Sequence, residues 1–538
     1  MLDAGRWRRA AGEQPARRVR WFQRRQVTSL SCQKIVRKFG HEIDIPSFSC
    51  QKRSRNFRHQ IDMPLYVGRE EETAELLQLQ RKRGASLVVL KGRRRIGKST
   101  FIRQCAKHFD HFLAFEGLAP RAGLTHREQL AAFAEQLAQQ TSLPKVSIDN
   151  WPQALQLLSS VMPATGSTLL LLDEISWMSI GDRDFAGHLK SAWDVQLSRH
   201  SRLIVVLCGS VSSWIDRNIL ASPGFVGRCS LSLALEPLAL PDCNAFWRGK
   251  RVSAAEKLKI LAVTGGVPRY LEEIDPSHSA ERNVHRLCFE SGGMLFREAE
   301  QIFHDVFDRR ADTYRQILST LVDGSRTVSE IGAKLKHERG GSLSFALDEL
   351  AAAGFLRRDV SFAPRTGQAY ARAIRYRLSD NYMRFYLKYV EPRRSQIEKK
   401  LYRNAPLDSL VAWDTIFGLQ VENLVLSSFD ALRPKLGLDR VEVINAGPYV
   451  QAKTQRRAGC QVDLLVRTKR TVHVVEIKLR DVVDRTVIDE VKQKVARLEG
   501  VRGLSVRTGL LYAGELDPRI EGEDYFDFVV ALEDLLDP

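Results

Sequence analysis

A glycine-rich loop directly after a short apolar strand is the feature that most limits what this chain can fold into. Residues 92–100 read Gly-Arg-Arg-Arg-Ile-Gly-Lys-Ser-Thr, the pattern GxxxxGK[ST], and they follow the apolar run 86–90. Glycines let backbone N–H groups wrap phosphate oxygens, while the lysine reaches the terminal phosphates and the serine holds Mg²⁺. The loop, here called the P-loop, therefore predicts a nucleotide site between a parallel strand and a helix. Its ligands would be Gly92, Gly97, Lys98, Ser99 and Thr100. The alternative is a glycine-rich turn with an incidental lysine.

Two carboxylates at the end of a second apolar strand are the predicted acidic partners of the P-loop. The run 168–172 is Thr followed by four leucines, and Asp173 and Glu174 come next. Such a run is typical of a buried parallel strand, which we expect beside the P-loop strand. Asp173 would hold Mg²⁺ and Glu174 would polarise the attacking water as a catalytic residue. The alternative is a strand merely capped by acids.

Two further residues are candidates for sensing or stabilising phosphate charge. A third apolar strand, 203–208, precedes Ser210, which would lie beside the terminal phosphate at the carboxyl edge of the sheet. Arg228 could stabilise the transferring phosphoryl group, either within its own chain or from a neighbouring subunit of a homo-oligomer. An arginine that only faces solvent fits its sequence context equally well.

These motifs together resemble the archaeal-type ATPases of the AAA+/STAND lineage. The segments VGREEE, GRRRIGKST, LLLLDEISW, VLCGS, SPGFVGR and TGGVPRYL occur in that order between residues 67 and 271. The resemblance implies an ATPase that uses ATP and Mg²⁺, with a core over residues 63–235 and a helical lid over 236–310. It also implies that Arg69 lies near the base of the nucleotide. Residues 265–268 indicate by themselves only a turn between helices, and their nucleotide-sensing role is implied by the resemblance.

Residues 311–404 have the element order of a winged helix. Three helices are predicted at 313–321, 328–335 and 342–353, followed by strands beginning at 355 and 373. The segment holds 18 Lys and Arg against 10 Asp and Glu, and four arginines lie in or near the wing, at positions 365, 372, 375 and 377. Asp348 and Glu349 on the third helix argue against base readout. We expect sequence-indifferent nucleic-acid contact or, alternatively, a packing module that relays the nucleotide state.

Residues 405–538 contain a second chemical pattern on a predicted β-hairpin. Glu476 and Lys478 stand two apart on one strand and therefore point to one face, and Asp463 on the partner strand can meet them. Two carboxylates can bind a divalent metal, and the lysine can orient or activate a water. A solvated strand with an incidental Glu-x-Lys pair is the alternative, but the apolar flanks would make that burial costly.

This D-x12-E-x-K pattern resembles the PD-(D/E)xK nuclease superfamily. The resemblance implies a C-terminal α/β restriction-endonuclease-like domain acting on nucleic acid, with Asp463 and Glu476 as metal ligands. It adds Glu422 from the preceding helix and a polar position at 492–493 on the following one. Archaeal-type ATPases often carry such a domain, so the resemblance extends over 63–538. The alternative is a switch or DNA-binding regulator whose tail only binds a partner.

Composition bears mainly on residues 1–62. They carry 15 Lys and Arg against 5 Asp and Glu, and so contribute +10 of the net charge of +18. Residues 29–46 and 47–64 form a tandem repeat. This basic segment is expected to be poorly ordered; it would be a nucleic-acid arm, a targeting segment, or upstream sequence if translation begins at Met63. The eight cysteines lack zinc spacing, and there is no membrane span or secretion signal, so a cytoplasmic protein is expected.

Overall fold

The structure is a computed structural model that describes most of the chain after residue 64. The described ranges are 65–209, 212–303, 310–335, 341–402, 406–455 and 457–536, without the side chains of Ser212, Ala371 and Arg372. They belong to one compact unit, Met63–Pro538. The expected arm at 1–62 lies outside the described residues.

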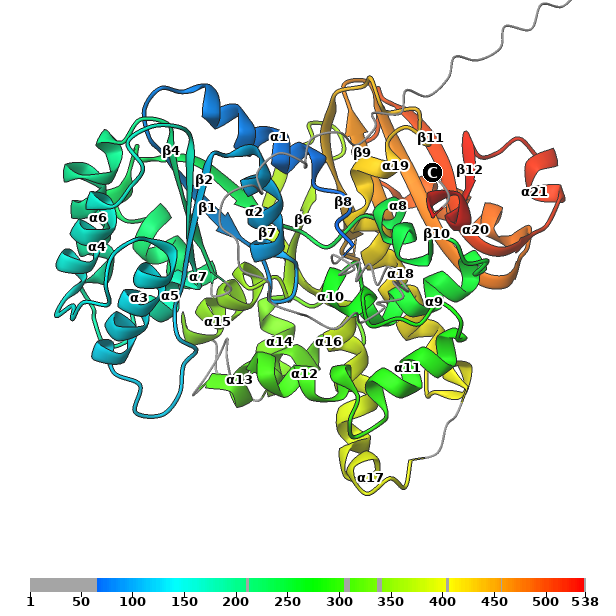
Figure 1. The fold of residues 1–538 in the computed structure, drawn as a ribbon. Helices are drawn as coiled ribbons and strands as arrows, with labels where there is room; N and C mark the ends of the chain where they lie inside the picture. Colours follow the sequence, from blue (N-terminus) through cyan, green and yellow to red (C-terminus); the bar gives the residue numbers. More distant parts are fainter. Residues whose placement is uncertain are drawn as a thin grey trace, which may run out of the picture. The chain divides into compact units, whose positions relative to one another are not determined.

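A five-stranded parallel sheet forms the first part of this unit (Figure 1). Its order is β2-β3-β4-β1-β5, and each neighbouring pair runs parallel, which confirms the predicted parallel α/β fold. The strands are β1 (Ser86–Lys91), β2 (His111–Glu116), β3 (Thr168–Asp173), β4 (Leu203–Cys208) and β5 (Cys229–Ala234). The first strand, the leucine-rich strand and the third apolar strand were predicted, whereas β2 and β5 were not.

Helices cover both faces of this sheet because its central strands are apolar on both sides. In β3, Leu169 and Leu171 pack with α1 and α2, while Leu170 and Leu172 pack with α3, α4 and α6. The helices are α1 (Glu70–Gln78), α2 (Lys98–Cys105), α3 (His126–Gln140), α4 (Trp151–Ser160), α5 (Ile175–Met178), α6 (Phe185–Val195) and α7 (Ser212–Ile215).

One expectation about this sheet is wrong. The strand that ends in Asp173 was expected next to the P-loop strand, but β4 lies between β1 and β3. The two strands still end at the same edge, because all the pairings are parallel. A parallel sheet can therefore bring the two motifs together across an intervening strand.

Helices follow the sheet over the predicted lid, and they surround a buried core. Gly265 ends α9 with a φ of 61°, as the predicted turn requires. A Cβ on Gly266 would lie 2.1 Å from the carbonyl oxygen of Leu238, so only glycine fits there. The helices are α8 (Leu240–Cys243), α9 (Ala254–Thr264), α10 (Pro268–Leu271), α11 (Ala280–Cys288) and α12 (Met294–Ile302).

The segment 311–404 shows the predicted order of three helices and an antiparallel strand pair. Its assignment as a winged helix remains a prediction. The strand pair is docked against the tail: Ser361 exchanges hydrogen bonds with the backbone of Val450, and Asn445 donates to the carbonyl of Gly367 at 3.0 Å. The elements are α13 (Ala311–Thr320), α14 (Val328–Leu335), α15 (Gly341–Ala352), β6 (Leu356–Phe362), β7 (Ala369–Leu378), α16 (Asn381–Phe385) and α17 (Arg394–Glu398).

Two of the four wing arginines are engaged within the protein. Arg377 makes two contacts to the carboxylate of Asp359, at 2.8 and 3.2 Å, and Arg375 bonds Ser325 and pairs with Glu330. These ion pairs, and the burial of Arg377, leave the two guanidinium groups poorly placed for phosphates. The net positive charge of this segment is therefore larger than the charge that its strand pair can present to phosphates.

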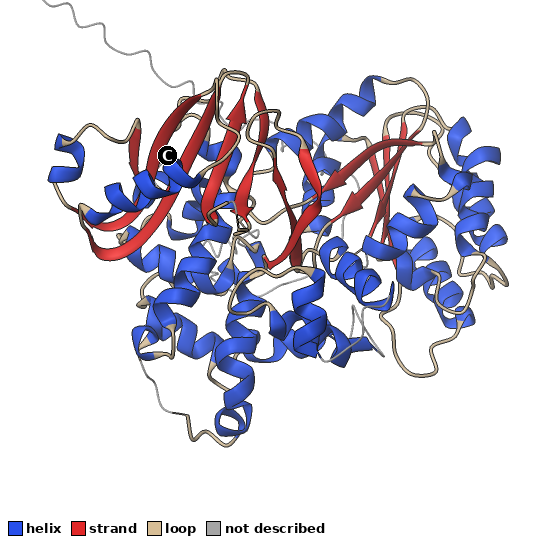
Figure 2. Cartoon of the chain, turned by 180° about the vertical axis from the view of Figure 1, so that it is seen from behind, coloured by secondary structure: helices blue, strands red, loops and turns tan. Residues whose placement is uncertain are grey.

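A second, mixed sheet of five strands forms the tail, shown from behind in Figure 2. Its order is β12-β11-β10-β9-β8, with β9–β10 antiparallel as predicted and β10–β11 parallel across the helix α20. Val475 and Ile477 share a core with α18, and Val472 and Val474 share one with α20. The elements are α18 (Trp413–Ser427), α19 (Phe429–Leu432), β8 (Val443–Gln451), β9 (Cys460–Thr468), β10 (Thr471–Val483), α20 (Thr486–Arg497), β11 (Ser505–Leu516), α21 (Arg519–Gly522) and β12 (Phe528–Ala531).

One apolar core runs through the lid, the 311–404 segment and the tail. It includes residues as far apart in the chain as Leu240, Leu347 and Leu511. Among the described helices, none has both the length and the apolar character needed to cross a bilayer.

Candidate nucleotide site and carboxylate cluster

The P-loop lies between the carboxyl end of β1 and the amino end of α2. Gly92 has a φ of 151° and Gly97 a φ of 90°, and a Cβ on Gly92 would lie 2.8 Å from the carbonyl oxygen of Leu235. Lys98 Nζ donates to the carbonyls of Gly92 and Arg93 at 3.0 and 3.2 Å. The loop thus curls over its own lysine and presents the first turn of α2, whose N–H groups favour anions.

The two predicted magnesium ligands lie side by side. Ser99 Oγ donates to Asp173 Oδ2 at 2.5 Å. Glu174 follows with a φ of 47°, a left-handed conformation that costs a non-glycine residue about 1–3 kcal/mol. Its N–H donates to Asp173 Oδ1 at 3.0 Å, which turns the chain sharply at the sheet edge. These hydroxyl and carboxylate oxygens fit the hard oxygen ligands that Mg²⁺ prefers.

A pocket of about 340 Å³ surrounds these groups. Its lining also includes residues that were not predicted as site residues: Glu116 at the end of β2, Trp177, and Arg269 with Glu272 from the lid. Burial, followed by Asp173 and Glu174, raises the pKa of Glu116. Glu116 could have been found from its position at the end of a strand, had β2 been predicted. Arg269 directly follows the Gly-Gly-Val-Pro motif.

Two other predicted site residues, Arg69 and Arg228, are not brought to this pocket. Arg69 pairs with Glu72 at 3.1 Å and donates to the carbonyl of Glu236. Arg228 makes a two-pronged contact with Asp194, at 2.6 and 2.9 Å, and neither arginine lines the pocket. Ser210 lies outside the described residues, although β4 does pair with β1 as its predicted role requires.

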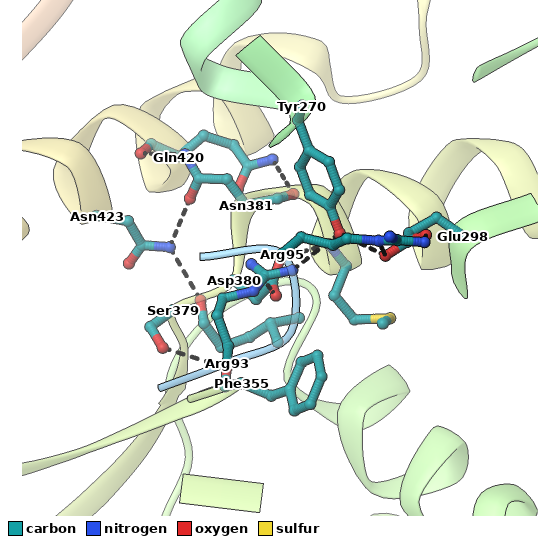
Figure 3. A network of polar contacts seen from close by, with 12 residues as sticks. Arg93, Arg95, Tyr270, Glu298, Phe355, Ser379, Asp380, Asn381, Gln420 and Asn423 are labelled. Carbon is teal, nitrogen blue, oxygen red and sulfur yellow. Dashed lines mark hydrogen bonds and ion pairs between the residues drawn. The ribbon is translucent and has the colours of Figure 1, made fainter. Parts of the chain in front are cut away.

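Two arginines of the P-loop, Arg93 and Arg95, reach into a buried polar network (Figure 3). Arg95 contacts the carboxylate of Glu298 on α12 at 3.1 and 3.3 Å. Arg93 forms an ion pair with Asp380, and its guanidinium also donates to the hydroxyl of Tyr270 at 3.1 Å. The P-loop is therefore joined both to the lid and to the segment that follows β7.

The tail residues predicted from the second motif lie together on β9 and β10. Lys478 Nζ contacts Glu476 Oε1 at 2.9 Å. The N–H of Ile477 donates to Asp463 Oδ2 at 3.0 Å, beyond the last backbone pair of the two strands, Val475 with Leu464. From α20, Lys494 Nζ lies 2.5 Å from Glu476 Oε2. Lys494 was missed, since the polar position had been expected at 492–493.

Burial and neighbouring acids raise the pKa values of two acids in this cluster, Glu422 and Asp463. Burial, followed by the charge of Asp463, raises the pKa of Glu422 to about 7. Burial, followed by the charge of Glu476, raises the pKa of Asp463 to about 6. Burial opposes the charge of Lys478, but the nearby Glu476 and Glu490 outweigh it and raise its pKa. Three acids and at least two lysines thus share one largely buried space.

This cluster does not fit a metal ion as it is arranged. Within the ranges that the structure describes, no three His, Cys, Asp or Glu side chains are grouped closely enough to hold one. Glu476 is 1% exposed and has an ammonium group on each carboxylate oxygen. Lysines therefore supply the positive charge that a metal would otherwise bring.

Comparisons with known proteins give distant likenesses. No family model matches the chain. Uncharacterized protein MJECL04 of Methanocaldococcus jannaschii is 22% identical over 433 residues, which cover 79% of this chain and 89% of that protein. The Walker-type ATPase PABY2304 of Pyrococcus abyssi is 17% identical, covering 60% of this chain and 96% of that one, with a TM-score of 0.43. The ORC2 protein of Aeropyrum pernix is 14% identical, covering 63% and 96%, with a TM-score of 0.38.

Proposed function

We propose that this protein binds and hydrolyses ATP with Mg²⁺ at the P-loop pocket. The observation that carries the proposal is the 2.5 Å contact between Ser99 Oγ and Asp173 Oδ2 beneath the first turn of α2. It joins the two motif residues that would hold Mg²⁺, although β4 lies between β3, which ends in Asp173, and β1, which leads into the P-loop. Neither alternative interpretation predicts this contact: a glycine-rich turn with an incidental lysine does not require a nearby carboxylate, and a strand capped by acids does not require a nearby serine.

The chain's own groups can each be given a part in the reaction. Lys98 would exchange the carbonyls of Gly92 and Arg93 for the terminal phosphates. Glu174 would orient the attacking water, and Arg269, which lines the pocket from the lid, would offset negative charge on the nucleotide. Mg²⁺, when bound, would neutralise charge on the phosphate oxygens. Arg228 is proposed to act only from a neighbouring subunit.

Nucleotide binding and phosphate release test the proposal. Lys98→Ala should lose ATP binding in calorimetry, whereas Glu174→Gln should bind ATP with about wild-type affinity and release phosphate at least ~100-fold more slowly. Arg103→Gln, on the same helix as Lys98 but outside the pocket lining, is the matched control. Normal turnover by Glu174→Gln would refute the role assigned to that carboxylate.

A second candidate function is metal-dependent cleavage of nucleic acid at the tail cluster. It is favoured by the meeting of Asp463, Glu476 and Lys478 on adjacent strands and by the raised pKa of the neighbouring Glu422. The lysine pairs of Glu476 support the alternative, a tail that binds a partner without cleaving it.

A plasmid-nicking assay with Mg²⁺ or Mn²⁺, with and without ATP, separates these two alternatives. Cleavage that disappears in Asp463→Ala and Lys478→Ala supports the nuclease. Absence of metal-dependent cleavage of both DNA and RNA supports the partner-binding tail. Arg358 on β6 and Arg365 in the connection between β6 and β7 are both exposed, and they are the arginines proposed to contact nucleic acid.

A further inference from the structure

Arg93 belongs to the P-loop but its side chain is turned away from the nucleotide pocket. It is 6% exposed and is absent from the pocket lining. Its guanidinium pairs with Asp380 and lies 5.5 Å from the ring centre of Tyr270 and 5.8 Å from that of Phe355 (Figure 3). The motif itself does not require an arginine at this position, so phosphate binding does not account for its burial.

The backbone of Arg93 nevertheless belongs to the nucleotide site. Its carbonyl accepts a hydrogen bond from Lys98 Nζ at 3.2 Å. Phosphate oxygens would compete for that same ammonium group. One residue therefore offers its carbonyl to the lysine that senses phosphate and its side chain to a carboxylate outside the pocket.

Asp380 and Asn381 connect this ion pair to helix α18. Asp380 Oδ1 accepts from the N–H of Met383 at 2.9 Å and so caps α16. The Asn381 side chain donates to the carbonyl of Gln420 at 3.1 Å, and the backbone carbonyl of Asn381 accepts from the side-chain amide of Gln420 at 2.8 Å. Asn423 donates to Asn381 Oδ1 at 3.0 Å. All of these side chains are at most 5% exposed, so they cannot exchange these bonds freely with water.

Helix α18 also carries Glu422, between the two residues that hold Asn381. Asn423 accepts a hydrogen bond from Arg377 as well, and Arg377 acts electrostatically on Glu422. A shift of Asn381 would therefore change its hydrogen bonds to Gln420 and Asn423, which lie within one turn of Glu422 on α18.

We propose that the Arg93–Asp380 ion pair couples occupancy of the nucleotide site to helix α18 and the carboxylate cluster, with Arg93 and Asp380 as positioning residues. This inference rests on the proposed ATP site. The physical basis is that a buried pair has few alternative arrangements, so a changed P-loop must keep or break it. The Arg95–Glu298 contact joins the same network, because the Tyr270 hydroxyl accepts from Arg93 and donates to Glu298 at 3.4 Å.

Hydrogen exchange of residues 413–427 with and without a non-hydrolysable ATP analogue and Mg²⁺ tests the coupling. In the wild type, the analogue should change exchange in this helix by about fivefold or more, within the range of ordinary allosteric coupling. Asp380→Asn keeps an N-cap acceptor for α16 but removes the charge. It should bind the analogue within about threefold of wild type and lose the response in α18.

Asp380→Asn leaves the buried charge of Arg93 without a partner, so a second variant is needed in case this one fails to fold. Arg93→Met/Asp380→Asn removes both charges, a change that buried ion pairs often tolerate, and should show no response at saturating analogue. Glu391→Gln is the matched control, because it breaks the 2.9 Å pair with Arg315 outside this connection and should retain the response.

The outcomes separate this inference from the proposed function. If the wild type binds the analogue and α18 does not respond, or if the variants respond as the wild type does, the coupling is overturned and the ATP site stands. If the wild type binds no nucleotide, the proposed function fails and the coupling fails with it.

Discussion

Lys494 Nζ of α20 lies 2.5 Å from Glu476 Oε2 of β10, and Lys478 Nζ lies 2.9 Å from the other oxygen of the same carboxylate. A divalent ion that used Glu476 would have to displace at least one of these ammonium groups. The tail is therefore held in a form in which lysine charge and metal charge compete for one acid.

Removing Lys494 should favour a metal in this cluster. Lys494→Met keeps most of the apolar stem and frees one carboxylate oxygen, so we expect Mn²⁺ affinity to rise about tenfold, or about 1.4 kcal/mol, in titration calorimetry. Lys492→Met on the same helix is the control, since Lys492 stacks on Tyr525 and faces Asp489 rather than Glu476. Unchanged Mn²⁺ affinity in Lys494→Met would show that the competition does not exist.

The stability of the protein should depend on pH through Glu422. Its pKa rises from 4.5 in the unfolded chain to about 7 in the fold, so its contribution is fully present below about pH 4.5 and is lost as pH rises through 7. Glu422→Gln should be nearly neutral at pH 4.5 and should raise the free energy of unfolding by about 2 kcal/mol at pH 8. Urea titration at both pH values measures this. The exposed Glu442→Gln should show no such difference, and a Glu422→Gln effect independent of pH would contradict the assignment.

The arginines of the strand pair should separate into structural and exposed classes. Arg377→Gln leaves Asp359 without its partner and should lower the free energy of unfolding by about 3 kcal/mol. Arg358→Gln, on the exposed side of β6, should stay within about 0.5 kcal/mol. Chemical denaturation of both variants decides this, and equal stability of the two would show that the Arg377–Asp359 pair contributes nothing.

The glycine pair of the lid should tolerate no side chain at its second position. A Cβ on Gly266 would approach the carbonyl of Leu238 to 2.1 Å, and the N–H of Leu238 already donates to Gly266 O at 2.7 Å. Gly266→Ala should therefore lower the free energy of unfolding by about 3 kcal/mol or more. Gly292→Ala, which has no atom within 4 Å of its added Cβ, is the matched control in thermal unfolding. A wild-type melting temperature for Gly266→Ala would contradict the predicted clash.

The strands that carry chemistry could be predicted because they are continuous apolar runs with a motif at their end. β1, β3 and β4 are buried along nearly their whole length. The strand β5 was not predicted, because it is only six residues long and its serines, Ser230 and Ser232, alternate with Leu231 and Leu233. So short an alternation cannot be distinguished from a loop without its neighbour β1.

The local chemistry of both sites was present in the sequence, because it depends on residue type and spacing. GxxxxGK[ST] determines how a loop wraps phosphate, and Glu-x-Lys places two side chains on one face of a strand. Which groups meet from distant parts of the chain was decided only by the tertiary structure. Asp173 reaches Ser99 across an intervening strand, Lys494 occupies Glu476, and Arg93 pairs with Asp380. These contacts depend on strand order and helix packing, which no local pattern encodes.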